Sequence, residues 1–311
     1  MPRTDDGTSS PAGATSATSA ASATSAASTS LLIRLRGIRP SLSPAEDRVA
    51  DIVLADARRA AGLTISELAN AARTSETTVL RFCRRLGVPG YPQLRLALAE
   101  ESAQPRTMSN TGTDISAKDS IDDIIAKVAF TDASAVEETA QQLDRASLAA
   151  AAAAIAKAGR IDIYGIGASS IVGTDLQQKL HRIGIVAFAW NDPHIALTSA
   201  TLLRPGDVAV GISHSGTTTE TIEALAAARS SGARTLAITN FPLSRLASGV
   251  DFLLTTAARE PSLRSGATAS RIAALTVVDC LHIAVAQRTL RRARKAVADT
   301  REAVAGHHVS D

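Results

Sequence analysis

The chain has little cysteine, few aromatic residues and no strong excess of charge of either sign. Its two cysteines, Cys83 and Cys280, lie far apart inside apolar patterns, and aromatic residues make up 3% of the 311 residues. This spacing fits neither a disulfide framework nor a metal site, so we expect two buried free thiols in a reducing compartment. Hydrophobic residues make up 45% of the chain, which is typical of a globular protein.

Long apolar segments are also scarce. The longest, Ala149–Ala156, is mostly alanine and is followed by Lys157. A membrane-spanning helix needs roughly 18 apolar residues, and a secretory signal needs an apolar core near the N-terminus. We therefore expect a cytoplasmic protein with no membrane partner. Its length is sufficient for two domains with separate cores.

The formal charge of +3 is unevenly distributed along the chain. Residues 31–100 hold 11 Arg and Lys against 7 Asp and Glu, whereas the remainder holds 22 against 23. The positive excess therefore lies in the N-terminal third, where it could contact a polyanion such as DNA. Because this excess is modest, the motifs of the region have to decide whether it is used.

Changes of composition divide the chain into four parts. Residues 1–30 are rich in Ser, Ala and Thr, which predicts a disordered tail. Residues 31–100 predict an all-α domain, and the polar residues 101–120, with a proline and a glycine, predict a linker. Residues 121–311 predict an α/β domain. The predicted fold class is thus an all-α domain followed by a doubly wound parallel sheet.

The sheet is predicted from short β-rich runs that alternate with amphipathic helices. Nearly continuous apolar strands separated by helices are typical of parallel sheets covered on both faces. The expected strands are 161–166, 185–190, 208–212, 235–239 and 252–255. The expected helices between and after them are 170–183, 194–203, 218–230, a short piece near Ser244 and a long tail over 268–304.

Two of the expected strands end in small and hydroxyl-bearing residues. Small residues let a ligand approach the backbone, and a following helix start presents unpaired N–H groups under a positive dipole end. Both loops therefore predict a site for a phosphate or another compact anion. A dinucleotide is a weaker alternative, because Ser169 stands near the place of the third glycine of its fingerprint. The candidate ligand-binding residues are Ser169, Ser170, Ser213, His214, Ser215, Gly216 and Thr218.

The two loops together resemble a known domain. Gly-x-Gly-x-Ser after the first strand and Ser-x-Ser-Gly-x-Thr after the third are similar to the SIS (sugar isomerase) domain, over Ile161 to about Leu290. That domain binds phosphorylated sugars in enzymes and in regulators. The resemblance implies that Ser213, Ser215, Gly216 and Thr218 hold the phosphate, with His214 in the variable place, and that Ser169 is the serine of the first loop.

Other polar residues of this domain have two interpretations each. Asp192 and His194 follow the second strand, and we expect Asp192 to cap the next helix in preference to either contacting sugar hydroxyls. Glu220 and Glu223 lie early in a helix and are expected to complement its dipole in preference to a catalytic role. Arg271 is assigned to an interface salt bridge in preference to a phosphate contact.

A helix-turn-helix is the main motif of the N-terminal domain. Residues 64–72 predict a short helix, Arg73 and Thr74 a tight turn, and residues 75–87 a second helix with Gly87 as its C-cap. In this arrangement the second helix enters the DNA major groove. A plain three-helix domain with a solvated basic face is the alternative. The candidate DNA-binding residues are Ser75, Glu76, Thr77 and Thr78 for base edges, and Arg81, Arg84 and Arg85 for bases or phosphates.

The longer context resembles the RpiR-type regulators, bacterial transcription factors that join such a domain to an SIS domain. The similarity spans about Leu31 to Val304 and leaves the Ser/Ala-rich tail unmatched. It implies a DNA-binding protein that dimerises through its SIS domain. The matching segments are Leu42–Glu46, Thr64–Ala69, Ser75–Val79, Arg81–Gly87 and Gly90-Tyr91.

The predicted function is transcriptional regulation controlled by a phosphorylated sugar. The expected partners are that sugar, a two-fold symmetric DNA operator and a second copy of the chain, because one recognition helix covers few base pairs. No catalytic residue, cofactor or metal is expected. One alternative is a sugar-phosphate isomerase with a helical appendage, which would need a Glu or His base. Another is a sugar-phosphate-binding adaptor that does not bind DNA.

Overall fold

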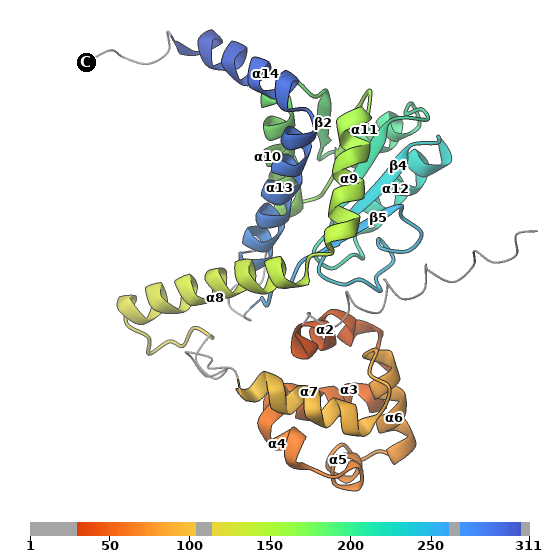
Figure 1. Cartoon of the computed structure of the whole chain (residues 1–311), viewed down its shortest axis with the longest axis vertical. Helices are drawn as coiled ribbons and strands as arrows, with labels where there is room; N and C mark the ends of the chain where they lie inside the picture. Colours follow the sequence, from red (N-terminus) through yellow and green to blue (C-terminus); the bar gives the residue numbers. More distant parts are fainter. Residues whose placement is uncertain (1–29, 104–113, 261–267, 306–311) are drawn as a thin grey trace, which may run out of the picture.

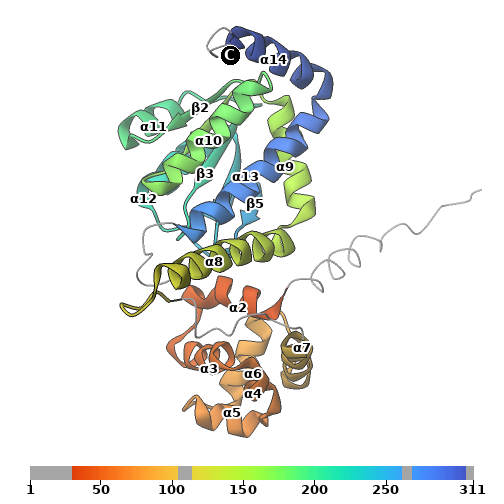
Figure 2. The ribbon, with the colours of Figure 1, turned by 90° about the vertical axis from the view of Figure 1, so that its left-hand side faces the viewer.

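The computed structural model describes residues 30–103, 114–260 and 268–305, which form a helical module and a larger α/β domain (Figure 1). Of the tail predicted over 1–30, all but Ser30 lies outside the described residues, as do residues 104–113 of the predicted linker. The two parts lie one above the other, with helix α2 between them in both views (Figure 2).

The helical module is built around a compact apolar core. Leu35 and Val49 pack there with Leu68, Phe82 and Leu94, all of them inaccessible to solvent. Burial of this kind supplies most of the free energy that offsets the chain's ordering entropy. The elements of the module are α2 (Leu31–Ile38), the 3-10 turn η2 (Arg39–Ser41), α3 (Pro44–Ala55), α4 (Ala57–Gly62), α5 (Ile65–Ala71), α6 (Glu76–Arg85) and α7 (Tyr91–Ala103).

The α/β domain contains one five-stranded parallel sheet in the order β2-β1-β3-β4-β5. This confirms the predicted fold class, an α-helical module followed by a doubly wound parallel sheet. The elements are α8 (Ile121–Gln142), α9 (Arg145–Lys157), β1 (Ile161–Tyr164), α10 (Ala168–Arg182), β2 (Ala187–Trp190), α11 (Pro193–Ala200), β3 (Val208–Ile212), α12 (Thr219–Ser230), β4 (Arg234–Thr239), β5 (Phe252–Thr255), α13 (Ala269–Arg288) and α14 (Leu290–Ala303).

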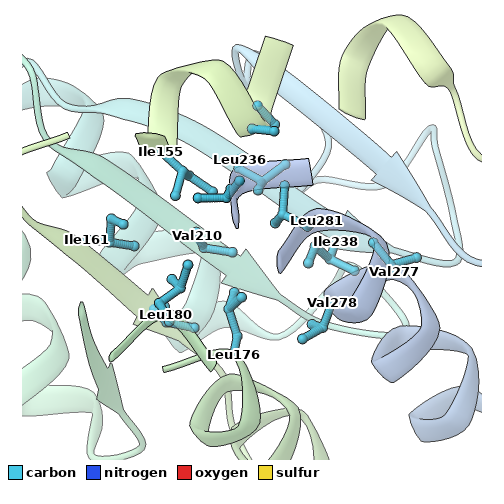
Figure 3. Close-up of a cluster of buried hydrophobic side chains, with 14 of the residues drawn as sticks. Ile155, Ile161, Leu176, Leu180, Val210, Leu236, Ile238, Val277, Val278 and Leu281 are labelled. Atoms are coloured by element: carbon cyan, nitrogen blue, oxygen red, sulfur yellow. The ribbon is translucent and has the colours of Figure 1, made fainter. Parts of the chain in front are cut away.

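Helices cover both faces of the sheet. On one face, Ile155 of α9, Leu176 of α10 and Leu281 of α13 pack against Val210 and Leu236 of the central strands (Figure 3). On the other face α11 and α12 pack through alanines and a few leucines. Because the central strands are buried on both faces, their sequences are continuously apolar and not alternating.

Several element boundaries differ from those predicted. Strand β1 ends at Tyr164 and not at Ile166, because the chain turns at Gly165 and at Gly167, which has a φ of +60°. The predicted C-terminal tail is two helices, which meet at Thr289. There the Thr289 hydroxyl donates to the Val285 carbonyl oxygen at 3.0 Å, a local bond that competes with helix continuation. The piece near Ser244 forms turns and no helix.

Helix α13 corrects the expectation that no segment approaches the length of a membrane span. The helix has 20 residues, an 18-residue stretch of it has a mean hydropathy of 1.6, and it meets that criterion by length and composition. The helix lies against α8, α9 and α10, and Val277, Val278 and Leu281 are fully buried there. Its apolar character is therefore used in the core of the domain.

Helix α2 packs against both parts of the molecule. Leu31 and Leu35 join the core of the helical module. Ile33, Arg36 and Gly37 instead line a crevice of about 220 Å³ shared with the α/β domain. The Arg36 guanidinium pairs there with the Glu138 carboxylate of α8 at 3.0 Å. The junction between the two parts is therefore a packed contact as well as a covalent connection.

Candidate functional site

The loops after β1 and β3 meet at one edge of the sheet. The two strands are paired, with Tyr164 opposite Gly211 at their carboxyl ends. From there the chain leads through α10 to β2 on one side and through α12 to β4 on the other. Such a switch point leaves a crevice between the departing loops, and ligands of α/β proteins bind in it.

The loop after β3 is held together by hydroxyl hydrogen bonds. The Ser213 Oγ lies 2.9 Å from the Thr218 Oγ1 and accepts from the Gly216 N–H at 3.1 Å. Gly216 has a φ of +65°, and a Cβ there would come within 2.0 Å of the Ser244 Oγ. Only glycine fits this position without moving its neighbours. The loop thus fixes Ser213, Ser215 and Thr218 around one turn of chain.

The helices that begin at these loops have no side-chain cap. The N-cap of α10 is Gly167, which has no side chain. The N-cap of α12 is Thr218, whose side chain accepts no bond from the first turn of the helix. The Ser170 hydroxyl donates to the Gly167 carbonyl oxygen at 2.6 Å. The positive dipole ends of both helices favour an anion at the same edge of the sheet, although the Ser169 and Ser170 N–H groups of α10 already donate to the Ile166 and Gly167 carbonyl oxygens at 3.2 and 3.1 Å.

A cavity with about 320 Å³ of space, part of it open to solvent, lies at the start of α10 and beside the loop that leads to α12. Of the predicted ligand-binding residues, Ser169 and His214 line it directly, while Ser213 and Ser215 lie in the adjoining loop. The full set of lining residues is Ala168, Ser169, Val172, Ile212, His214, Ile238, Thr239, Thr256, Ser270, Arg271 and Ala274. The cavity therefore has an apolar floor and a small number of polar groups, as ligand sites commonly do.

His214 is the most buried titratable side chain of this cavity. Its ring packs edge-to-face on Phe241 with centroids 5.6 Å apart. Burial lowers the pKa of His214, and the nearby Glu260 carboxylate only partly opposes this shift. Its Nδ1 is enclosed and has no hydrogen-bond partner among the described residues. A ring nitrogen without a partner can form one hydrogen bond once a small movement of the ring brings it to a ligand.

Four polar lining residues were not predicted for this site. Thr239 ends strand β4 and Thr256 directly follows strand β5, and no motif distinguishes them from ordinary residues at strand ends. Ser270 and Arg271 begin α13, and Arg271 had been assigned to an interface salt bridge in preference to a phosphate. The signal for the last two is their place at a helix start after the small residues 266–269.

The second candidate site is the exposed face of α6 in the helix-turn-helix. Ser75 caps α6, and its Oγ lies 3.1 Å from the Thr78 Oγ1. Thr78 is buried, so its hydroxyl serves the cap and does not face solvent. Glu76 accepts a hydrogen bond from the Ser66 hydroxyl of α5. The exposed predicted residues are therefore Ser75, Glu76, Thr77, Arg81, Arg84 and Arg85.

Two of the predicted arginines share a buried partner. The Glu46 side chain of α3 is 1% exposed and accepts from the Arg81 Nε at 2.9 Å. The Arg85 Nε lies 3.7 Å from the same oxygen. Burial tends to raise the pKa of Glu46, but the hydrogen bonds from Ser43 and Arg81 outweigh it and hold the pKa below its usual value. Glu46 was not among the residues predicted from the sequence to contribute to DNA binding.

Both sites match known protein families. Residues 29–105 match the helix-turn-helix domain of the rpiR family, and residues 154–284 match the SIS domain. An HTH-type transcriptional regulator of Caldanaerobacter subterraneus is 39% identical over 84% of this chain and 92% of its own. The chain belongs to the rpiR family. The resemblance inferred from the sequence motifs is thereby confirmed.

Two further similarities extend this rpiR-family assignment. The Vibrio vulnificus NanR protein, solved in complex with ManNAc-6P, is 34% identical and aligns over 90% of this chain and all of its own, with a TM-score of 0.58. The bifunctional protein glk of Burkholderia thailandensis is 35% identical over 82% of this chain, which spans 39% of that protein. The family architecture thus occurs alone and within a longer polypeptide.

The remaining candidates of this rpiR-family chain do not line the cavity. Asp192 accepts from the backbone N–H groups of His194 and Ile195 at 2.9 and 3.0 Å, which is the cap that was favoured. His194, Glu220 and Glu223 are exposed and absent from the lining of the cavity.

Both cysteines are free, Cys83 fully buried and Cys280 partly so. Burial raises the pKa of the Cys83 thiol to about 11, so the thiol is inert.

Proposed function

We propose that this chain is a cytoplasmic regulator of transcription whose binding to an operator is modulated by a phosphorylated sugar. The observation that carries the proposal is the cavity at the start of α10, which the loop leading to α12 borders through His214. The positive dipole ends of α10 and α12 and the hydroxyls of Ser213 and Ser215 suit a phosphate dianion, because charge-assisted hydrogen bonds are the strongest available.

The remaining cavity wall suits the sugar portion of such a ligand. His214 and Ser270 offer hydrogen-bonding groups, Arg271 offers a cation, and Val172 and Ile212 form an apolar floor. The complex of the related NanR with ManNAc-6P supports a sugar phosphate as the ligand class.

A short segment after β4 connects this cavity to the junction with the helical module. The Asn240 N–H donates to the His214 carbonyl oxygen at 3.1 Å, and Phe241 packs on the His214 ring. Pro242 then lies against Gly37 of α2, where a Cβ on Gly37 would be 3.3 Å from the proline ring. Thr256 lines both the cavity and the crevice under α2. A ligand that moves His214 or Thr256 would therefore act on α2.

We infer that the ligand shifts the balance between two placements of the helical module. A ligand changes such a balance only by its differential affinity for the two states. A homodimer on a two-fold symmetric operator would convert a small rotation of α2 into a changed spacing of two recognition helices. The basic face of α6, with Arg81, Arg84 and Arg85, supports the DNA contact.

The same geometry argues for sensing and against catalysis. Isomerisation moves a proton between adjacent carbons and needs a placed base. Glu220, Glu223 and His194 do not line the cavity, and His214, which does, lies in the loop that is similar to the phosphate-binding loop of the SIS domain. We therefore propose that the ligand is bound and released unchanged.

The experiment measures operator affinity during ligand titration. Fluorescence anisotropy would follow the full-length chain on a duplex that it has enriched from a random-sequence library, with ManNAc-6P and a panel of other sugar phosphates. We expect at least one sugar phosphate to change the Kd by about fivefold or more, a usual coupling strength. Indifference to the whole panel would refute sensing, failure to enrich any duplex would refute DNA binding, and turnover of the sugar would show an enzyme.

A further inference from the structure

We propose that Glu46 is a positioning residue for DNA recognition, which orients the guanidinium groups of Arg81 and Arg85 on the exposed face of α6. This inference rests on the proposed DNA binding. Glu46 lies in the first turn of α3, outside the helix-turn-helix itself, and its buried carboxylate pairs with Arg81 of α6.

The two carboxylate oxygens of Glu46 have separate tasks. Oε2 accepts from the backbone N–H and the hydroxyl of Ser43 at 2.9 and 2.7 Å, which closes the capping box at the start of α3. Oε1 accepts from the Arg81 Nε at 2.9 Å and lies 3.7 Å from the Arg85 Nε. The capping bonds fix the carboxylate in space, so the oxygen offered to α6 is also fixed.

The spacing of the two arginines explains why one oxygen can serve both. Residues four apart on a helix lie one above the other on the same face. Arg85 has a second anchor, because its Nη1 donates to the Ser41 carbonyl oxygen at 2.8 Å. The Arg81 side chain is 57% exposed although its Nε is bonded. Arg81 is therefore held at its base with its outer end in solvent.

Holding Arg81 through Nε leaves its terminal amino groups directed outward. These two groups form the fork that bonds a guanine edge or a phosphate bidentately. A free arginine loses rotamer freedom when it binds, whereas an oriented one has already lost much of it. Glu46 would thus raise affinity for the correct site, where the fork fits, more than for DNA in general.

A purely structural role for Glu46 makes a different prediction. Glu67 of α5 provides the comparison, because its Oε2 accepts from the Thr64 N–H and hydroxyl at 2.7 and 2.8 Å in the same kind of capping box. Among the described residues, no ion pair joins Glu67 to α6. If Glu46 only caps α3, then Glu46→Gln and Glu67→Gln should have similar consequences.

The test compares these two variants of the full-length chain on the enriched duplex and on a shuffled duplex of the same composition. For Glu46→Gln we expect the ratio of the two affinities to fall on the order of tenfold, as for a lost base contact. Affinity for the shuffled duplex should stay equal or rise, because a negative charge near DNA is removed. Glu67→Gln should keep the wild-type ratio. A Glu46→Gln ratio equal to wild type, or an equal loss on both duplexes, would overturn the inference.

Two further measurements keep the test decisive. In an Arg81→Ala background, Glu46→Gln should cause no additional loss of the affinity ratio, because the residue acts through Arg81. If Glu46→Gln is unfolded in thermal melts, Arg81→Lys replaces it, since lysine keeps the charge without the Nε donor or the fork. Wild-type discrimination by Arg81→Lys would then refute the role of Glu46. A wild-type chain that does not discriminate between the duplexes would instead refute the proposed DNA binding.

Discussion

The helical module and the α/β domain differ in how many of their helix N-termini carry a side-chain cap. In the module the side chains of Ser43, Asp56, Thr64 and Ser75 cap α3, α4, α5 and α6. In the α/β domain α8, α9 and α11 are capped in the same manner, but α10, α12, α13 and α14 are not. Of these four, α10 and α12 follow the central strands at the switch point.

The difference separates a surface that is fixed in advance from a site that is completed by its ligand. A capped helix has its first N–H groups satisfied, which stabilises it by about 1 kcal/mol and keeps its orientation. An uncapped start lacks a side-chain acceptor, and an anion can take the place of the cap. The module thus presents preformed side chains to DNA, while the α/β domain has two helix starts at which a ligand can take the place of a cap.

The largest effect should come from removing the hydroxyls beside the uncapped starts. We expect the double variant Ser213→Ala, Ser215→Ala to lose about 100-fold or more in sugar-phosphate affinity, because hydrogen bonds to charged groups are worth about 1.5–3 kcal/mol each. Operator affinity without ligand should stay within about twofold of wild type, because these hydroxyls bond within their own loop and not to the helical module. Thermal melts should show that the variant is folded. Calorimetry with the active sugar phosphate and anisotropy with DNA measure the two quantities.

A cap deletion in the other region is the matched control. Ser75→Ala removes the side-chain cap of α6 and should lower the free energy of unfolding by about 1 kcal/mol while leaving ligand affinity unchanged. If Ser75→Ala also abolished the ligand response, the division of labour between capped and uncapped helices would be wrong.

A smaller loss, confined to DNA, is expected from Arg81→Ala. The variant removes one outward fork and leaves the Glu46 carboxylate buried without its closest cation. Operator affinity should fall about tenfold or more, and ligand affinity should not change. Arg84→Ala serves as the comparison, because Arg84 is exposed and forms no ion pair with Glu46 among the described residues. Parallel losses of DNA and ligand binding in Arg81→Ala would mean that the two sites are not separate.

The smallest effect concerns pH and His214. Burial lowers the pKa of His214 in the folded chain, so in acid the unfolded chain binds a proton first. The free energy of unfolding should therefore decrease as pH falls below about 6.5, by at most about 1.4 kcal/mol per pH unit from this group. Urea unfolding at pH 8 and pH 5.5 measures the difference, and His214→Gln should reduce it. A difference unaltered by His214→Gln would show that other groups cause it.

Much of the fold follows from sequence patterns that burial enforces. Strand β3 was predicted to the residue, because a strand buried on both faces is uniformly apolar and is bounded here by Asp207 and Ser213. The helix-turn-helix was predicted because caps, inward apolar residues and a C-terminal glycine all agree. Gly87 indeed has a φ of +70°, and Val79 and Phe82 are fully buried.

The parts that were missed depend on contacts between distant segments. Thr256 and Ser270 reach the cavity only because β5 and the start of α13 come to the edge formed by β1 and β3. Glu46 has an ordinary capping position in sequence, and its bond to Arg81 spans 35 residues. Local pattern contains no information on such pairs, so the two loops were predicted and the rest of their surroundings were not.

The sharing of α2 between two apolar environments limits how this protein can be recombined. A chimera that joins this DNA-binding module to another sensor must carry α2 with the module, since Leu31 and Leu35 complete its core. The opposite side of the same helix, through Gly37 and Arg36, must then fit a foreign proline and glutamate. Engineers who exchange sensors should therefore graft the outward residues of this helix together with the new domain.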